Sequence, residues 1–226
     1  MIPSAAPPDR MRARTRRPGS ARGILCRMNE RSSRPAPALK PPSRARARGR
    51  AFTTRDGHRL RLRPLRPDDV EALKRGFARL TPDQVRQRTF HRMNELTDEA
   101  AQRLAQVDAA TAAAYVVVDD DGEFHGEARL HETTRGESAE FALVVDPQML
   151  GVGIGRALMR RLFEEARRRG LRELWGTVLA ENSLMLDFAR RLGARREMVA
   201  GEHDLVRVRF ELTRPLRGRR RQPSSG

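Results

Sequence analysis

The sequence predicts an α/β fold in which one mixed central sheet of about seven strands is flanked by helices. Three observations predict it. Short apolar runs rich in β-branched residues recur between turn residues, segments with helical periodicity alternate with them, and both patterns are confined to residues 51–213. Strands and helices that alternate in this way form a layered domain with a partly parallel sheet.

The two ends of the chain differ from this domain in composition. Residues 1–50 hold 14 Lys and Arg against Asp9 and Glu30, and residues 214–226 hold five Arg and no acid. Since these ends carry 12 and 5 of the 17 net positive charges, residues 51–213 are electrically neutral. We expect both basic tails to be disordered, because they have too few large apolar residues to offset the entropy of ordering.

Charge and cysteine usage exclude several classes of protein. A neutral domain argues against a nucleic-acid footprint on the folded surface, although the Arg-rich tails could contact nucleic acid weakly and non-specifically. The single cysteine, Cys26, lies in the N-terminal tail, so the domain has no disulfide framework and no cysteine nucleophile. No apolar run approaches the ~20 residues that span a bilayer. We therefore expect a cytoplasmic protein with no membrane contact.

The first half of the domain is predicted to place three short helices between two strands. The alternating run Arg59–Arg63 is typical of a half-buried strand, and Ala112–Val118 is an apolar, β-rich strand. Helices are expected to begin near Pro67, Pro82 and Thr97, where prolines and acids occupy the first turn.

The second half is predicted to contain five strands and two helices. The strands are Phe124–His131, Ala139–Val145, Leu171–Leu179, Arg195–Ala200 and Asp204–Leu212, and the helices are Gly155–Arg169 and Ser183–Leu192. On the first helix, Leu158, Leu162 and Ala166 form the face that packs on the sheet. The pairs Arg160/Glu164, Glu164/Arg168 and Glu165/Arg169 are expected on its solvent side.

A glycine-rich loop joins the strand Ala139–Val145 to the long helix. Gly151, Gly153 and Gly155 remove side chains where a backbone could approach a phosphate, and the helix offers unpaired N–H groups and a positive dipole end. The lysine and Ser/Thr of a nucleotide P-loop are missing. Four predicted strands precede the loop, whereas a dinucleotide site places its loop after the first strand. The loop therefore predicts an anion cradle of another kind.

The run Gly151–Leu158, GVGIGRAL, resembles the pyrophosphate-binding loop of GNAT acetyltransferases. The segment from Asn182 to Met185 resembles the family's helix start, whose asparagine often faces the cofactor. Where the family usually has Gln or Arg before the first glycine, this chain has Leu150. The resemblance implies acetyl-CoA as cosubstrate and no metal. The residues that it implies for acetyl-CoA binding are Val144, Val145, Leu150, Gly151, Val152, Gly153, Ile154, Gly155, Arg156, Asn182 and Met185.

Five further segments resemble the acetyltransferase domain of bacterial protein lysine acetyltransferases. They are Arg55–Gly57, Arg61–Asp69, Leu96–Glu99, Gln106–Asp108 and Ala139–Val145. This resemblance implies direct transfer of acetyl, in a ternary complex, to a lysine or other amine of a protein such as an acyl-CoA synthetase.

Glu140, on the strand that leads into the glycine loop, is the candidate general base. A lysine amine has a pKa of ~10.4 and must lose a proton before it attacks, and the resembling enzymes use a strand glutamate in this region. Glu127, on the neighbouring strand, is the second candidate. Main-chain N–H groups near Val144 and Val145 could polarise the thioester carbonyl. Where many family members carry an acid tyrosine, this chain has Ala189.

Two other functions remain open from the sequence. One is a small-molecule amine N-acetyltransferase, whose acceptor cleft would be lined by Arg75–Leu96; this Arg-rich segment favours an acidic or large partner. The other is a degenerate CoA-binding domain tethered to nucleic acid by the basic tails. His125 and His131 would lie ~20 Å apart along one strand and do not form a metal pair. Tyr115 and Trp175 are expected in the core.

Overall fold

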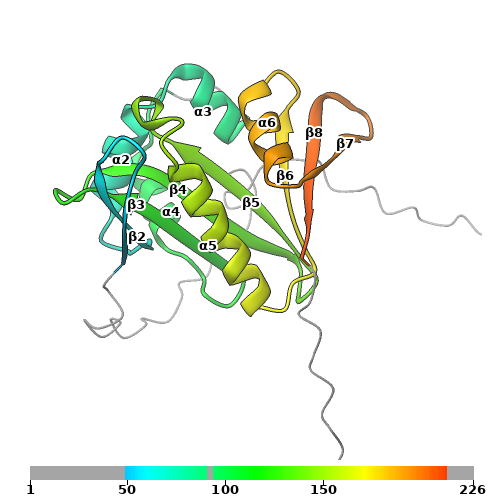
Figure 1. Ribbon diagram of the computed structural model, residues 1–226, viewed down its shortest axis with the longest axis horizontal. Coiled ribbons are helices and arrows are strands. Elements are labelled where there is room, and N and C mark those ends of the chain that lie inside the picture. Colours follow the sequence, from blue (N-terminus) through cyan, green and yellow to red (C-terminus); the bar gives the residue numbers. More distant parts are fainter. Residues whose placement is uncertain (1–48, 91–93, 213–226) are drawn as a thin grey trace, which may run out of the picture.

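The computed structural model describes residues 49–90 and 94–212, which form one eight-stranded sheet with helices on both faces (Figure 1). The strand order is β1-β2-β3-β4-β5-β6-β8-β7, and only β5 and β6 pair in parallel. The strands are β1 (Arg50–Thr53), β2 (Arg59–Pro64), β3 (Ala112–Val118), β4 (Phe124–Thr134), β5 (Ser138–Val145), β6 (Glu173–Leu179), β7 (Arg195–Val199) and β8 (Glu202–Glu211). The helices are α2 (Val70–Ala78), α3 (Pro82–Thr89), α4 (Asp98–Ala105), α5 (Ile154–Arg168) and α6 (Ser183–Arg191), with a 3-10 turn, η2, at Pro147–Met149. The predicted α/β fold with a mixed sheet is confirmed.

The sheet has one strand more than the sequence predicted. β1 pairs antiparallel with β2, so that Arg50 lies opposite Leu62 and Thr53 opposite Arg59. Its four residues are mostly exposed, and so short an edge strand carries no detectable alternation. Five strands therefore precede the glycine loop instead of four. Residues 1–48 and 214–226 of the two basic tails, with Cys26 and the nucleic-acid contact expected of the tails, lie outside the described residues, whereas Arg50, which we expected in the N-terminal tail, belongs to β1.

The first helix begins at Val70 and not at Pro67 as predicted. Asp69 occupies the N-cap position, and its carboxylate accepts hydrogen bonds from Arg63 Nη1 at 2.6 Å and Arg63 Nη2 at 2.8 Å. The same carboxylate accepts from the Arg66 N–H at 2.8 Å. This acid therefore ties the start of α2 to β2, and does not lie in the first turn of the helix.

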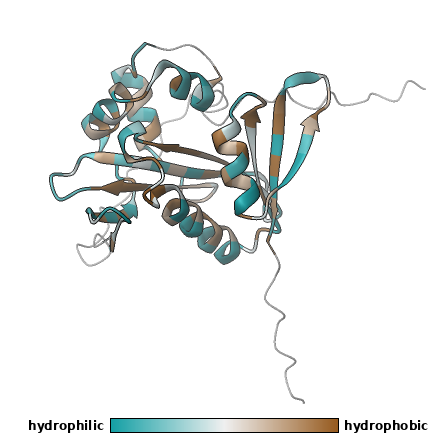
Figure 2. Ribbon diagram, turned by 45° about the horizontal axis from the view of Figure 1, so that its top comes forward, coloured by the Kyte–Doolittle hydropathy of each residue, from teal (hydrophilic) through white to brown (hydrophobic). Residues whose placement is uncertain are grey.

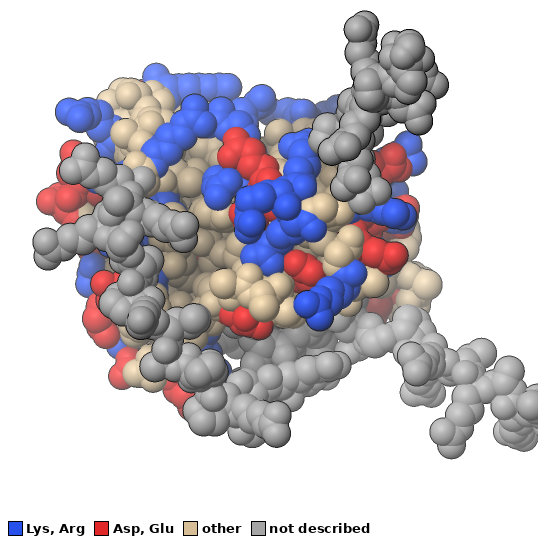
Figure 3. Space-filling model, turned by 90° about the horizontal axis from the view of Figure 1, so that it is seen from below, with Lys and Arg blue, Asp and Glu red and all other residues tan. Residues whose placement is uncertain are grey.

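The two faces of the sheet are covered by different helices. α5 packs across β3, β4 and β5 on one face, and Leu158, Leu162 and Ala166 are fully buried there, as predicted. α2, α3 and α4 pack on the opposite face, where a second, smaller apolar cluster surrounds Val116. The central strands are mostly apolar, whereas α5 shows both apolar and polar residues (Figure 2). On the surface seen from below, Lys and Arg predominate at the centre and upper edge, with smaller patches of Asp and Glu among and beside them (Figure 3).

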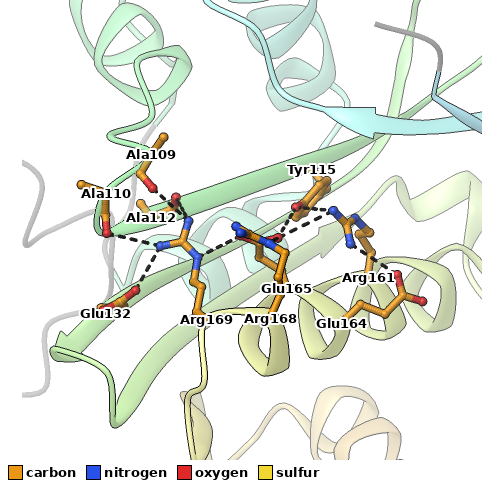
Figure 4. A network of polar contacts seen from close by, with 10 residues as sticks. All are labelled: Ala109, Ala110, Ala112, Tyr115, Glu132, Arg161, Glu164, Glu165, Arg168 and Arg169. Atoms are coloured by element: carbon orange, nitrogen blue, oxygen red, sulfur yellow. Dashed lines mark hydrogen bonds and ion pairs between the residues drawn. The ribbon is translucent and has the colours of Figure 1, made fainter. Parts of the chain in front are cut away.

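The prediction that the charge pairs of α5 lie on its solvent side is wrong for Glu165 (Figure 4). Its carboxylate is only 3% exposed and accepts hydrogen bonds from Arg168, Arg169 and the Tyr115 hydroxyl. Arg168 binds Glu165, while Glu164 pairs with Arg161 at 3.3 Å. Position 165 lies three residues after the buried Leu162, so it belongs to the edge of the apolar stripe, where the side chain of Tyr115 meets it.

Two ionisable groups of this network, Glu165 and Tyr115, make the stability of the fold depend on pH at the acid and the alkaline end. Burial alone would raise the pKa of Glu165, but the hydrogen bonds and charges of Arg168 and Arg169 prevail and lower this pKa to about 2. Burial and the charge of Glu165 raise the pKa of Tyr115 to about 12. The stability contributed by Glu165 is present above its ordinary pKa of 4.5 and is lost as the pH falls toward 2. The stability linked to Tyr115 is present below pH 10 and is lost between pH 10 and 12.

Replacing Glu165 with glutamine is expected to lower the free energy of unfolding at pH 7 by ~3–5 kcal/mol, because it removes one partner from a buried ion pair. The variant should also lose less stability than the parent between pH 4.5 and pH 2. Urea denaturation followed by circular dichroism at pH 7, pH 4.5 and pH 2 measures both effects. The control is Glu164→Gln on the exposed side of the same helix, which should cost less than ~1 kcal/mol. Equal losses in the two variants would contradict the assigned role of Glu165.

Candidate active site

β5 and β6 pair over only three residues and then separate. The pairs are Ser138 with Glu173, Ala139 with Leu174 and Glu140 with Trp175. Beyond Glu140, β5 stays paired with β4, and β6 stays paired with β8. Figure 1 shows the two strands diverging from the end at which they meet. The sheet therefore opens into a wedge between residues 141–145 of β5 and residues 176–179 of β6.

Phe141 and Gly176 lie at the narrow end of this wedge. A Cβ atom on Gly176 would lie 2.8 Å from the Phe141 ring, closer than real Cβ contacts allow. Glycine at this position therefore lets the Phe141 ring pack against β6 at the point where the strands part.

A cavity of about 320 Å³ occupies the wedge and is bounded by α3, α6 and the glycine loop. The predicted site residues that line it are Glu140, Val144, Val145, Leu150, Gly151, Gly153, Gly155, Arg156, Asn182 and Met185. Three predicted site residues do not line it. Ile154 is fully buried in the core, and the carbonyl of Val152 accepts a hydrogen bond from the Arg55 N–H. Glu127 lines a second cavity of about 70 Å³.

The glycine loop and the start of α5 form a main-chain cradle at one end of the cavity. Gly151 and Gly153 have φ values of 81° and 111°, in the region that favours glycine, and no atom lies within 4 Å of a Cβ built on either. The first intrahelical hydrogen bond runs from the Ala157 N–H to the Gly153 carbonyl at 3.0 Å. The N–H groups of residues 154–156 precede that bond and are oriented to bind an anion.

Asp146 holds the turn that leads into this cradle. Its carboxylate accepts from the Gln148 N–H at 3.0 Å and from Nε of Arg79, the C-cap residue of α2, at 3.0 Å. Its own N–H donates to the His125 carbonyl at 3.1 Å. These three contacts join the end of β5 to β4 and α2, so the position of the glycine loop is fixed by the packed domain.

The sequence did not single out Arg55 as a binding residue, and the structure brings it to the glycine loop. The Arg55 N–H donates to the Val152 carbonyl at 3.2 Å, and the Arg55 side chain lines the cavity. Leu150, 43% exposed, occupies the place where a polar side chain was expected. The turn between β1 and β2 therefore supplies a positive charge on the side of the cradle where Leu150 supplies none.

The backbone of β5 presents polar groups to the wedge at alternate residues. The Val145 carbonyl accepts from Gln84 Nε2 of α3 at 3.0 Å, on the side away from β4, whereas the N–H of Asp146 points toward β4. Because successive residues of a strand direct their N–H groups to opposite sides, the N–H groups of Leu143 and Val145 face the wedge. By the same alternation the N–H group of Val144, like that of Asp146, faces β4.

Glu140 lies where the paired segment of β5 ends and the wedge begins. It is 3% exposed, lies between His131 of β4 and Trp175 of β6 in register, and lines the cavity. Arg88 of α3 lines the same cavity. A carboxylate is therefore buried next to the open part of the sheet.

Glu127 has a different environment. Its carboxylate accepts from Arg129 Nε at 2.5 Å and from Arg88 Nη2 at 3.2 Å. Burial alone would raise the pKa of Glu127, but the charges and hydrogen bonds of Arg129 and Arg88 lower it. A carboxylate held by two guanidinium groups is a weak proton acceptor.

α6 contributes the opposite wall of the cavity. Asn182 caps this helix through its Oδ1, which accepts from the Met185 N–H at 3.0 Å, and both residues line the cavity. Ala189 is fully buried in the core, and Phe188 beside it lines the cavity. Tyr115, 5% exposed, lies in the network of Glu165 away from the cavity lining, and Trp175 is 8% exposed under Arg207.

In the described ranges 49–90 and 94–212, no group of three or more His, Cys, Asp and Glu residues is arranged to hold a metal ion. His125 instead contacts Asp119 at 2.9 Å and Asp146 at 3.4 Å. None of the helices described is long and apolar enough to cross a membrane.

A glycine loop at a helix N-terminus beside a wedge in a mixed sheet is an arrangement that can bind a phosphate-bearing ligand. Residues 59–195 match the acetyltransferase (GNAT) domain. The chain therefore belongs to the GNAT family of acetyltransferases and is an acyltransferase enzyme.

Two named acetyltransferases are similar to this chain in sequence. Acetyltransferase PA5475 of Pseudomonas aeruginosa is 30% identical over 141 residues, which cover 61% of this chain and 76% of that protein. The ribosomal protein bS18-alanine N-acetyltransferase of Escherichia coli is 37% identical over 57 residues, which cover 25% of this chain and only 38% of that protein.

Solved structures share the fold. The GNAT domain of S. lividans PAT superposes with a TM-score of 0.68 at 24% identity, over 76% of this chain and all of that chain. A cAMP-binding acyltransferase from Mycobacterium smegmatis superposes with a TM-score of 0.52 at 25% identity, over 77% of this chain. The present chain spans about half the length of that second protein, 50% of which is covered.

Proposed function

We propose that this acetyltransferase binds acetyl-CoA in the wedge and transfers the acetyl group directly to an amine of a protein, with Glu140 as general base. One observation carries the proposal: the pairing of β5 with β6 ends at a buried carboxylate, in the same cavity as a glycine cradle at a helix N-terminus. Acetyl-CoA is the acetyl donor of the GNAT family; its pyrophosphate would lie at the glycine cradle and its thioester near Glu140.

The residues of the cradle fit the pyrophosphate of coenzyme A. Gly151 and Gly153 leave open space where side chains would stand, and the N–H groups of residues 154–156 provide donors. Arg55 and Arg156 line the same cavity and supply positive charge to the phosphates. The pantetheine arm would then lie along β5 and against Asn182 and Met185.

The transfer step assigns one task to each group at the wedge. The acceptor nitrogen attacks the thioester carbonyl carbon, Glu140 takes the proton from that nitrogen, and the C–S bond breaks to release the thiolate of coenzyme A. The N–H groups of Leu143 and Val145 would stabilise the carbonyl oxygen as charge develops on it. Glu140 suits the base role better than Glu127, because Glu127 is held by two arginines and lies at the other cavity.

A lysine or other amine of a protein, for example of an acyl-CoA synthetase, is the acceptor that we propose. The support is the likeness to the S. lividans PAT domain, together with the protein-directed activity in the name of the E. coli relative. A screen that offers purified acyl-CoA synthetases, lysine peptides and polyamines with acetyl-CoA, read by mass spectrometry of the products, tests this choice. Acetylation of polyamines alone would favour the small-molecule alternative.

Replacing Arg55 with glutamine is expected to weaken acetyl-CoA binding about 3- to 10-fold, since it removes one exposed cation beside the phosphates. The difference between parent and variant should shrink as the salt concentration rises. Calorimetric titrations at 50 mM and 300 mM NaCl measure both effects. Arg59→Gln, at the far end of the same turn and outside the cavity lining, is the matched control. Equal effects of the two substitutions would exclude a specific contact by Arg55.

A further inference from the structure

Arg88 of α3 lines both the wedge cavity and the smaller cavity that Glu127 faces, and one end of its guanidinium group is unsatisfied. Its side chain is 7% exposed, and Nη2 donates to Glu127 at 3.2 Å. Nη1 is buried and has no hydrogen-bond partner within the part of the chain that the structure describes. A buried hydrogen-bond donor without a partner lowers the free energy of unfolding by about 1–3 kcal/mol, and by more when the donor is charged. An unsatisfied buried Nη1 therefore points to a ligand that would accept a hydrogen bond from it.

The charges around Arg88 do not balance during the proposed reaction. Glu127 is shared between Arg88 and Arg129, and Glu140 is the second carboxylate near Arg88. Burial lowers the pKa of Arg88, while the charges of Glu127 and Glu140 act in the opposite direction. Once Glu140 has accepted a proton, two buried guanidinium groups face a single carboxylate. Another anion at this point would restore the balance.

A second unsatisfied group lines the same cavity from the opposite wall. Thr177 lies on β6, two residues after Trp175, and therefore on the sheet face that also carries Glu140. Its Oγ1 is buried and, among the described residues, has no hydrogen-bond partner. Arg88 and Thr177 thus offer hydrogen-bond donors from two separate elements, α3 and β6.

We propose that Arg88, together with Thr177, forms a subsite for a carboxylate of the acceptor, held next to the amine that Glu140 deprotonates. The inference rests on the proposed function, because it specifies the chemistry of the acceptor for the same site. A guanidinium group binds carboxylate through strong charge-assisted hydrogen bonds, which would satisfy Nη1. The carboxylate comes either from an Asp or Glu beside the target lysine of a protein, or from the acceptor itself if it is an amino acid.

Matched acceptor pairs test the subsite in the full-length protein. One series compares lysine peptides with Glu or Gln beside the target lysine, and the other compares free amino acids with their amides. The parent enzyme is expected to prefer the carboxylate member by about 10- to 100-fold in kcat/KM, and the series in which this happens identifies the source of the carboxylate. In Arg88→Gln the ratio should fall to about one, with the Kd for acetyl-CoA unchanged within twofold. Arg86→Gln, on the same helix beside Glu181, should keep the parent's ratio.

Three results would overturn the subsite: a parent ratio near one, a preference for the neutral member, or a preference that survives in Arg88→Gln. If Arg88→Gln fails to fold by circular dichroism, Thr177→Val replaces it and should lower the ratio severalfold without a change of charge. If no acceptor is acetylated at all, the proposed function fails, and titration of the same pairs into the protein saturated with coenzyme A still tests the subsite. Tighter binding of the carboxylate member supports it, and equal or undetectable binding of both members rejects it.

Discussion

Alanine at Gly153 is expected to weaken acetyl-CoA binding about 10- to 100-fold while the domain stays folded. Gly153 has a φ of 111° and forms the N-cap of α5. A residue with a Cβ is strained by about 1–3 kcal/mol in this region, so the loop would move away from the geometry that presents the helix N–H groups. The added methyl group would also enter the open space that we assign to phosphate. Calorimetric titration of acetyl-CoA into the parent and the variant measures the change.

Gly136→Ala is the matched control for that substitution. Gly136 has a φ of 70° in the turn between β4 and β5, with no atom within 4 Å of a built Cβ, so alanine is again forced to adopt a positive φ, with less strain than at Gly153. It does not line the cavity of the wedge. The control variant should lose stability but bind acetyl-CoA as the parent does. Weakened binding in both variants would show that the effect of Gly153→Ala arises from general destabilisation.

Glutamine at Glu140 is expected to lower kcat about 10²- to 10⁴-fold and to leave the Kd for acetyl-CoA unchanged. The amide is nearly the same size as the carboxylate but cannot accept the proton of the attacking amine. Because a lysine amine has a pKa of ~10.4, the rate of the variant should rise steeply as the pH approaches 10 and the free amine accumulates. Steady-state rates between pH 7 and pH 10 test both expectations.

Glu164→Gln, on the exposed side of α5, controls for the loss of one negative charge and should retain the parent's rate. A Glu140→Gln variant with normal kcat would remove Glu140 from the chemistry. A large fall in the affinity for acetyl-CoA would instead assign Glu140 to donor binding. In either case, the matched acceptor pairs still test whether Arg88 causes a preference for acceptors with a carboxylate.

The parts of the site that are contiguous in sequence could be predicted. The run from Gly151 to Leu158 carries both the turn glycines and the periodicity of the helix that follows, so the cradle could be inferred before its geometry was known. Glu140 could be chosen because it lies on the strand that enters the loop. The number of strands was underestimated because β1 is a short, exposed edge strand whose pairing with β2 depends on the packed domain.

The residues that sequence reasoning missed act through contacts between distant segments. Arg88 meets Glu127, 39 positions later in the chain, and nothing in the sequence of α3 distinguishes it from Arg86, which lies on the outer side. Arg55 reaches the glycine loop only because β1 and β2 bring their turn there. Glu165 has the spacing of a surface charge pair, and its burial follows from the position of Tyr115 on β3, 50 positions earlier.

Amide hydrogen exchange with and without acetyl-CoA tests most directly whether the wedge is the donor site. We expect acetyl-CoA to slow exchange in peptides covering residues 141–145 and 151–156, where N–H groups face the wedge and the cradle, and to leave exchange in β7 unchanged. Slowed exchange at another place, or none anywhere in a folded protein at saturating acetyl-CoA, would contradict it.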